Sequence, residues 1–317
     1  MTVFHPDLHP VARFIPRFSF TPRLVRFINF VARRRGVPKP PALTDVSVED
    51  VFLRRQEGAA PMRVRVYRPR HAAQPVPAML WLHGGGFVFG APEFDQENNI
   101  ATVRELGILV AAIDYRLAPE HPFPAPMEDA YAALTWLHGS ADALGVARGR
   151  YAIAGSSAGG GLAAGLALMA HDRGEVPVAF QLLLYPMLDD RTVLRTDVDT
   201  SNLRMWDTAS NRYGWTSYLG GRAPGSAGVS AYAAPARRED LSGLPPVWMG
   251  TGGFDLFHDE NLAYARRLAA AGTPCELRVV AGAYHGFDAI SRNARVSQDF
   301  RSSYVAALRH ALFAKDQ

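Results

Sequence analysis

The chain has 317 residues, of which 48% are hydrophobic and 20% charged, and its formal net charge is +4. These values are typical of a globular protein with a sizeable core, and they exclude a disordered or low-complexity chain. No stretch approaches 18 uncharged apolar residues, and the N-terminus lacks the unbroken apolar core of a secretory signal. We therefore expect neither a membrane span nor secretion. The lone Cys275 cannot form an internal disulfide, so we expect it to be a small buried residue in a cytoplasmic protein.

Residues 1–45 form a predicted N-terminal cap segment with a strong basic bias. Only Asp7 opposes this charge before Asp45. The segment carries no recognisable nucleic-acid-binding motif, so the charge alone does not indicate that partner. The basic residues are Arg13, Arg17, Arg23, Arg26, Arg33, Arg34, Arg35 and Lys39.

A basic amphipathic helix is predicted inside this segment. Thr21 is a favourable N-cap, Pro22 a favourable first residue, and Gly36 a favourable stop. The helix either lies on an anionic membrane surface or covers a pocket of the folded core as part of a lid. Its apolar stripe has helical spacing and consists of Leu24, Phe27, Ile28 and Val31.

A glycine-rich loop follows the third predicted strand. Residues 46–52 and 62–67 alternate enough to open the fold as an antiparallel pair, and residues 78–82 then run into His83-Gly84-Gly85-Gly86. Such a loop exposes backbone N–H groups that can stabilise a negatively charged oxygen. A phosphate loop would need a following Lys-Ser/Thr or a different glycine spacing, whereas Phe87 and Phe89 suit an acyl-binding wall. We expect His83 to orient the loop.

The pentapeptide Gly155-Ser156-Ser157-Ala158-Gly159 follows the apolar run 151–154 and precedes a predicted helix over 162–171. A G-x-S-x-G sequence between a strand and a helix is a nucleophile elbow, and it nominates the hydroxyl of Ser157. The N–H of Ala158 would join those of the glycine loop as an oxyanion donor. A buried strand over 108–113 and a helix over 127–137 lie between the two motifs.

The rhythm of buried strands stops after the strand over 180–184, which ends at Tyr185-Pro186. Residues 188–234 are polar but carry several aromatic side chains, so we expect a cap insertion above the functional site. Some of these rings should pack a small satellite core and a few should face the substrate. They are Trp206, Tyr213, Trp215 and Tyr218.

An acid and a histidine follow the serine in the order that a catalytic triad on this type of sheet requires. Asp255 follows a strand over 246–251, and His285 follows a strand over 277–280, with a helix over 261–271 between them. This β-α-β unit brings both loops to one edge of the sheet. His285 would take the proton of Ser157, and Asp255 would hold the imidazole tautomer. The rival acids are Asp259, Glu260 and Asp288, of which the first two suit the first turn of the helix.

Together these motifs make the chain resemble the hormone-sensitive-lipase-like branch of the α/β-hydrolases, known as bacterial esterase family IV. The matching stretches are residues 83–86, 114–125, 155–160, Asp255 with Asp259-Glu260, and 285–287. The resemblance implies an α/β fold with a mostly parallel central sheet, helices on both faces and a helical cap. It implies a core of residues 46–187 and 235–317, with 188–234 inserted as cap, and it favours a lid role for the N-terminal helix.

The resemblance also implies a carboxylic ester hydrolase with Ser157, Asp255 and His285 as its triad. Gly85, Gly86 and Ala158 would supply the oxyanion N–H groups, and no cofactor or metal would be needed. We expect an acyl-enzyme intermediate and short- to medium-chain acyl or aryl esters as substrates. Candidate pocket residues are Phe87, Phe89, Tyr185, Trp206 and Trp215.

The sequence departs from the family pattern at two places, and two other hypotheses about its function stay open. Ser156 stands where the family commonly has Asp or Thr, and Asp255-Leu256-Phe257 replaces the usual Asp-Pro-Leu. The substrate could instead be a lactone, a carbohydrate acetate or a xenobiotic ester. A non-catalytic ligand receptor on the same scaffold is a further alternative, although that family loses the triad histidine and His285 is present. A homodimer through the edge strand 277–281 is possible.

Overall fold

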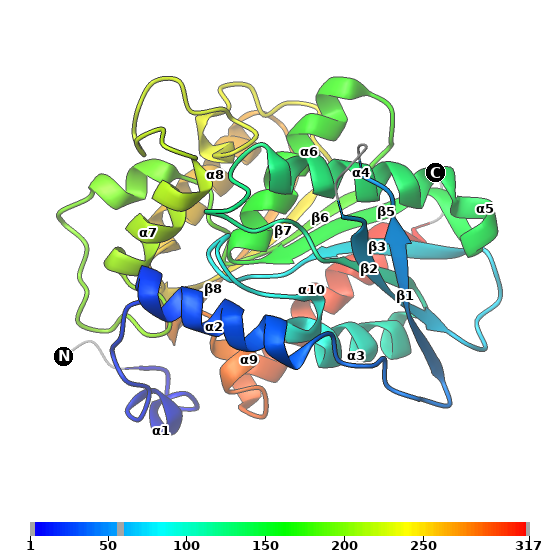
Figure 1. Ribbon diagram of the computed structural model, residues 1–317, viewed down its shortest axis with the longest axis horizontal. Coiled ribbons are helices and arrows are strands. Elements are labelled where there is room, and N and C mark those ends of the chain that lie inside the picture. Colours follow the sequence, from blue (N-terminus) through cyan, green and yellow to red (C-terminus); the bar gives the residue numbers. More distant parts are fainter. Residues whose placement is uncertain (1–3, 56–59, 315–317) are drawn as a thin grey trace.

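The computed structural model describes residues 4–55 and 60–314, and its centre is an eight-stranded sheet (Figure 1). The strand order is β1-β2-β4-β3-β5-β6-β7-β8. The β1–β2 and β2–β4 pairs are antiparallel and the remaining pairs are parallel. This confirms the predicted antiparallel opening pair and the mostly parallel sheet that the resemblance implied. The strands are β1 (Val46–Leu53), β2 (Met62–Pro69), β3 (Val76–Leu82), β4 (Leu109–Ile113), β5 (Val146–Ser156), β6 (Phe180–Leu184), β7 (Val247–Phe254) and β8 (Cys275–Tyr284).

Helices cover both faces of the sheet, which explains why β3, β4 and β6 are buried along their whole length. One face is covered by α4, α6 and α8, and the other by α3 and α10 (Figure 1). None of the described helices combines the length and the apolar character needed to span a bilayer. These helices are α3 (Gln96–Leu106), α4 (Ala125–Gly139), α6 (Ala158–Arg173), α8 (His258–Ala270) and α10 (Arg295–Phe313).

Shorter helical pieces occur in the connections and in the N-terminal part. Cys275, which we expected to be buried, is half-buried at the start of β8, and burial raises the pKa of its thiol to about 11. The short pieces are α1 (His9–Ala12), η1 (Pro92–Asp95), α5 (Ala141–Leu144), η2 (Asp190–Leu194), α7 (Thr208–Tyr218), η3 (Pro235–Arg237) and α9 (Phe287–Ile290).

The predicted N-terminal helix is α2 (Pro22–Arg35), and its predicted ends are confirmed. The Thr21 hydroxyl caps it by accepting a hydrogen bond from the N–H of Leu24. The predicted apolar stripe is only partly right, because the fully buried residue is Val25, whereas Phe27 is 63% exposed. Asn29 gives the reason: its amide donates to the backbone carbonyl of Val88, which turns the Val25 and Asn29 side of the helix toward the core.

The N-terminal segment is held against residues 188–234, far away in the sequence. The Ser19 hydroxyl donates to the carboxylate of Asp207, and the N–H of Phe20 donates to the hydroxyl of Ser210. Asp207 is also the N-cap of α7, because it accepts from the N–H of Ser210. The N-terminal segment and residues 188–234 therefore meet at the first turn of α7.

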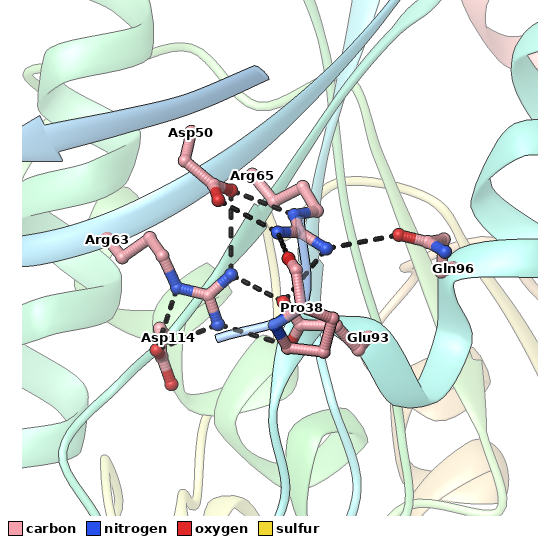
Figure 2. Close-up of polar contacts among 7 residues, drawn as sticks. All are labelled: Pro38, Asp50, Arg63, Arg65, Glu93, Gln96 and Asp114. Carbon is pink, nitrogen blue, oxygen red and sulfur yellow. Dashed lines mark hydrogen bonds and ion pairs between the residues drawn. The ribbon is translucent and has the colours of Figure 1, made fainter. Parts of the chain in front are cut away.

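A buried charge network fastens the other end of the N-terminal segment to the sheet (Figure 2). Arg65 on β2 is fully buried, and its Nη2 atom donates to the carbonyl of Pro38 at 2.7 Å and to the Asp50 carboxylate at 2.8 Å. The neighbouring Arg63 binds Glu93 and Asp114. Burial alone would raise the pKa of Glu93, but the hydrogen bonds from Arg63 hold it below its usual value.

Candidate active site

Ser157 lies at the tip of a sharp turn between β5 and α6. Its φ of 55° and ψ of −120° are strained for a side-chain-bearing residue, as expected of a nucleophile elbow. The turn also brings two backbone segments together, since a β-carbon on Gly159 would come within 2.1 Å of the Leu82 carbonyl oxygen. Only glycine fits that position without moving the backbone, which explains one of the two motif glycines.

The structure brings the three predicted triad residues into one hydrogen-bonded chain. His285 Nε2 lies 2.9 Å from Ser157 Oγ, and His285 Nδ1 lies 2.7 Å from Asp255 Oδ2. Asp255 follows β7 and His285 follows β8, so the parallel sheet places both at the carboxyl edge where Ser157 stands. This order of a hydroxyl, an imidazole and a carboxylate can activate the hydroxyl as a nucleophile.

The Asp255 carboxylate has a second support in the loop that departs from the usual Asp-Pro-Leu. Its Oδ1 atom accepts a hydrogen bond from the N–H of Phe257 at 2.9 Å. The Phe257 ring packs edge-on against the imidazole of His285, with 5.3 Å between the ring centroids. In the usual Asp-Pro-Leu the proline would stand at position 256, so the N–H donor at position 257 is retained whichever residue follows the acid.

The rival acid Asp288 is paired elsewhere. Its Oδ1 atom accepts from the hydroxyl of Tyr185 at 2.9 Å, and burial raises the pKa of its carboxyl. The Tyr185 ring also packs against the His285 imidazole at 4.8 Å. The structure therefore places Tyr185, a predicted pocket residue, as a wall behind the histidine.

The glycine loop lies beside Ser157. A β-carbon on Gly84 would be 3.4 Å from the Ser157 Cβ atom, and the loop is closed by hydrogen bonds from the N–H groups of residues 88 and 89 to the Gly85 carbonyl. Within the part of the chain that the structure describes, no acceptor is recorded for the N–H groups of Gly85 and Gly86. The N–H of Ala158, the first residue of α6, has no acceptor within its helix.

His83 holds the start of this loop through a hydrogen bond and a ring contact. It is fully buried, and its ring stacks on Tyr115 with 4.1 Å between the centroids. Burial lowers the pKa of its imidazole, so the neutral ring donates from Nδ1 to the Gly84 carbonyl at 2.7 Å. The Tyr115 hydroxyl in turn donates to the His83 carbonyl. This arrangement agrees with the orienting role that we expected for His83.

The predicted pocket aromatics divide into two groups. Phe87 and Trp215 are fully buried and pack with Tyr218, and all three belong to the main hydrophobic core on the α4, α6 and α8 face of the sheet rather than to a small separate core. Trp206 lies over the glycine loop, since a β-carbon on Gly86 would come within 2.1 Å of its ring. Phe89 is half-buried at the same loop.

Sequence reasoning missed the residues that join the N-terminal cap segment to this loop. The Phe20 ring stacks on Phe89 at 4.8 Å and contacts Trp206 at 5.5 Å, and Asn29 binds the Val88 carbonyl. The contact of Asn29 with Val88 could have been suspected from the sequence, because a polar Asn lies among apolar residues of an amphipathic helix. Nothing in the local pattern singled out Phe20.

Glu260 has a structural role beyond the first-turn position that the sequence predicted. It does occupy the first turn of α8, but its side chain is buried and accepts from the N–H of Leu188 at 2.7 Å and from the Thr192 hydroxyl. Burial raises the pKa of this carboxyl well above its usual value. Its neighbour Asp259 is exposed, as expected of a first-turn charge, and binds the half-buried His258 and Arg195. Glu260 thus holds the chain where the cap insertion begins.

The described residues contain no group of three or more His, Cys, Asp or Glu side chains that could hold a metal ion. All three members of the hydrogen-bonded chain are buried, with Ser157 6% and His285 7% exposed. The three side chains are therefore largely shielded from bulk water.

Comparisons with known proteins agree with this geometry. A family model described as alpha/beta hydrolase fold matches residues 79–289. The chain is 35% identical to Esterase LipI of Mycobacterium tuberculosis (strain ATCC 25618 / H37Rv) over 80% of this chain and 79% of that protein. It is 33% identical to Carboxylesterase NlhH of Mycobacterium tuberculosis (strain CDC 1551 / Oshkosh) over 99% of both chains. A solved structure described as Bacterial Heroin Esterase superposes with a TM-score of 0.89 at 36% identity, covering 98% of this chain and 99% of that one.

Proposed function

Because this chain belongs to the alpha/beta hydrolase fold family and is a serine carboxylesterase of its hormone-sensitive-lipase-like branch, we propose that it cleaves short- to medium-chain acyl or aryl esters through an acyl-enzyme formed on Ser157. The observation that carries this proposal is the continuous hydrogen bonding from Ser157 through His285 to Asp255.

In this mechanism Ser157 Oγ attacks the ester carbonyl carbon while His285 Nε2 takes the hydroxyl proton. The imidazolium then gives this proton to the departing alkoxide, and the alcohol leaves. A water molecule, deprotonated by the same nitrogen, then attacks the acyl carbon. The bond from this carbon to Ser157 Oγ breaks, the acid is released, and the imidazolium returns its proton to Oγ. Asp255 keeps the Nδ1 proton on the imidazole and stabilises the imidazolium that forms in each half-reaction.

The negative oxygen of each tetrahedral intermediate would be held by the N–H groups of Gly85, Gly86 and Ala158. Two facts support this assignment: the loop lies beside Ser157, and these donors have no recorded acceptor among the described residues. Fixed donors aimed at a developing oxyanion are worth about 10²–10³ in rate each.

The preference for short to medium acyl groups follows from the family resemblance and from the aromatic side chains at the glycine loop. Phe89 and Trp206 remain the best candidates for pocket walls, since both stand at the glycine loop under the N-terminal segment. We assign residues 1–45 and 188–234 to the cap and residues 46–187 and 235–317 to the catalytic core. We further propose a cytoplasmic location, from the single cysteine, and a homodimer through residues 277–281 of β8, which lies at the sheet edge.

The decisive experiment measures hydrolysis of p-nitrophenyl esters, acetate through laurate, by the native enzyme, by Ser157→Ala and by Ser156→Ala. Loss of the nucleophile should lower kcat by about 10⁴–10⁶. Ser156→Ala is the matched control, because it removes a hydroxyl group from the neighbouring serine. It should keep activity within about tenfold, since Ser156 is outside the hydrogen-bonded chain.

The outcomes separate the parts of the proposal. Full activity of Ser157→Ala would show that another residue is the nucleophile. A rate that rises steadily toward laurate would contradict the short- to medium-chain assignment. Faster turnover of a simple lactone than of every linear ester would favour the lactone alternative.

A further inference from the structure

The side of α2 that faces away from the core carries an ordered stripe of its own. Arg23, Phe27, Phe30 and Arg34 are spaced by four, three and four residues, so they lie on one side of the helix. The opposite side holds the buried Val25 and the bonded Asn29. Figure 1 shows α2 lying across the front of the molecule, beside the sheet rather than within it.

The outward phenyl rings are solvent-exposed and belong to a larger apolar surface. Phe27 is 63% and Phe30 53% exposed, and beyond them Val37 and Phe94 are 56% and 59% exposed. Phe27, Val37 and Phe94 line one groove of about 670 Å³ between α2 and η1. We call this surface the aromatic–arginine face, and it consists of Arg23, Phe27, Phe30, Arg34, Val37 and Phe94.

The charge on this face is not neutralised by the protein. Residues 13–39 contain eight basic side chains and no acidic one. Across the described ranges, their recorded ion pairing is limited to Arg33 with Glu120, at 3.7 Å between exposed groups. Arg34 instead lies over the Phe30 ring, 5.0 Å from its centroid, so its charge stays available to an external anion.

We propose that the aromatic–arginine face binds the surface of an anionic lipid bilayer, with α2 parallel to the membrane plane. Phenyl rings in one line can enter the boundary between headgroups and acyl chains, while the flanking guanidinium groups remain at the lipid phosphates. Each arginine near such a surface adds electrostatic attraction. A second copy of this chain fits the face poorly, because a symmetric dimer through it would bring two arginine stripes against each other.

This binding is independent of ester hydrolysis and therefore has its own readout. The inner side of α2 contacts the glycine loop through Asn29 and Val88, so one helix links the lipid-facing surface to the proposed oxyanion donors. The bilayer would seat the enzyme with its cap segment toward the lipid, and the catalytic core would remain outside the membrane.

The test is co-sedimentation of the full-length protein with vesicles of phosphatidylcholine alone or mixed with phosphatidylglycerol. We expect binding only to the mixed vesicles, and its loss at about 1 M salt, where the Debye length falls to about 3 Å. Phe27→Ala/Phe30→Ala and Arg23→Gln/Arg34→Gln should each weaken the partition coefficient about tenfold or more. Phe27→Leu/Phe30→Leu should restore most of the binding lost in the alanine variant.

The matched controls remove similar groups on another surface. Phe313→Ala and Arg295→Gln change exposed residues of α10 and should bind as the native protein does. Thermal unfolding midpoints check that every variant folds. Absence of native binding to the mixed vesicles would overturn the proposal, and so would equal binding by the stripe variants and controls. A concentration-dependent dimer that the alanine variant abolishes, without vesicle binding, would overturn it in favour of self-association.

Discussion

The imidazole Nδ1 of His285 lies 2.7 Å from Oδ2 of Asp255. A second carboxyl, that of Asp288, is only three residues from the histidine in sequence, but it accepts a hydrogen bond from Tyr185 instead. The neutral histidine therefore carries its proton on Nδ1 and presents the Nε2 lone pair to the serine hydroxyl. The two acids therefore differ in their hydrogen-bond partners, and only Asp255 contacts the imidazole.

Replacing each acid by its amide should show this difference. Asp255→Asn can donate to Nδ1 and stabilise the wrong tautomer, so we expect kcat for p-nitrophenyl acetate to fall by about 10²–10⁴. Asp288→Asn keeps an acceptor for the Tyr185 hydroxyl and should change kcat by less than about tenfold. Equal losses in the two variants would contradict the assignment of Asp255.

Trp206→Ala should impair turnover without touching the hydrogen-bonded chain. The indole packs on Gly86 and on the Phe20 ring, so its removal frees the glycine loop to move. We expect kcat to fall about tenfold to a hundredfold, because small displacements of positioned groups are costly. The preferred acyl chain should lengthen as the space opens.

Trp136→Ala is the matched control, because Trp136 lies on α4, away from the loop. Rates should be compared well below the unfolding midpoint of each variant, since loss of a packed Trp also costs stability. If both variants lose turnover equally, Trp206 has no specific role at the loop.

The sequence predicted the sheet and the hydrogen-bonded chain because both depend on local signals. The run of strand, turn and helix around Ser157 and the strand ends before Asp255 and His285 are visible residue by residue. The cap contacts were not predictable, because they join distant segments. No pattern near Phe20 reveals its ring partner Phe89, and the first-turn position of Glu260 gives no hint that its side chain turns inward.

Glu260 should make stability depend on pH. Burial raises the pKa of its carboxyl well above the usual value, so its protonated form is favoured in the folded state. Its stabilising contribution is complete below the unfolded pKa of about 4.3 and is lost as pH rises through the folded pKa. Glu260→Gln mimics the protonated carboxyl, since its amide can donate to Thr192 and accept from Leu188.

We therefore expect the unfolding midpoint of Glu260→Gln to fall less than that of the native protein between about pH 5 and pH 8. Glu260→Ala leaves the buried N–H of Leu188 unpaired and should lose about 1–3 kcal/mol throughout this range. Glu49→Gln alters an exposed glutamate and serves as control. If the unfolding midpoints of Glu260→Gln and of the native protein change equally with pH, the Glu260 carboxyl is ionised in the folded state.

Arg65→Met should destabilise the protein strongly. It keeps much of the side-chain volume but leaves the Asp50 carboxylate and the Pro38 carbonyl without their buried donor. Breaking a buried pair costs about 3–5 kcal/mol in the free energy of unfolding, which urea titration measures. Arg104→Met breaks an exposed pair with Asp45 and should change the urea midpoint little.

The free energy of unfolding at acid pH provides an independent check on the pairing of Arg65 with Asp50. Hydrogen bonds and charges from Arg65 hold the pKa of Asp50 below its usual value, although burial opposes them. A carboxyl whose pKa is lower in the folded protein than in the unfolded chain stabilises the fold above its unfolded pKa. This stabilisation is lost as pH falls through the pKa of the folded state. The native protein should therefore lose more stability on acidification than Arg65→Met, and the reverse order would contradict the pairing.

The contact between Asn29 and Val88 has a consequence for how variation can reach the active site. The acceptor on the loop is a main-chain carbonyl, which every amino acid possesses, so no exchange of the side chain at position 88 deletes that oxygen. The donor amide belongs to one asparagine on α2. Substitutions that alter this hydrogen bond must therefore occur on the N-terminal helix. The sequence of the glycine loop can stay the same while the residues of α2 that cover it change.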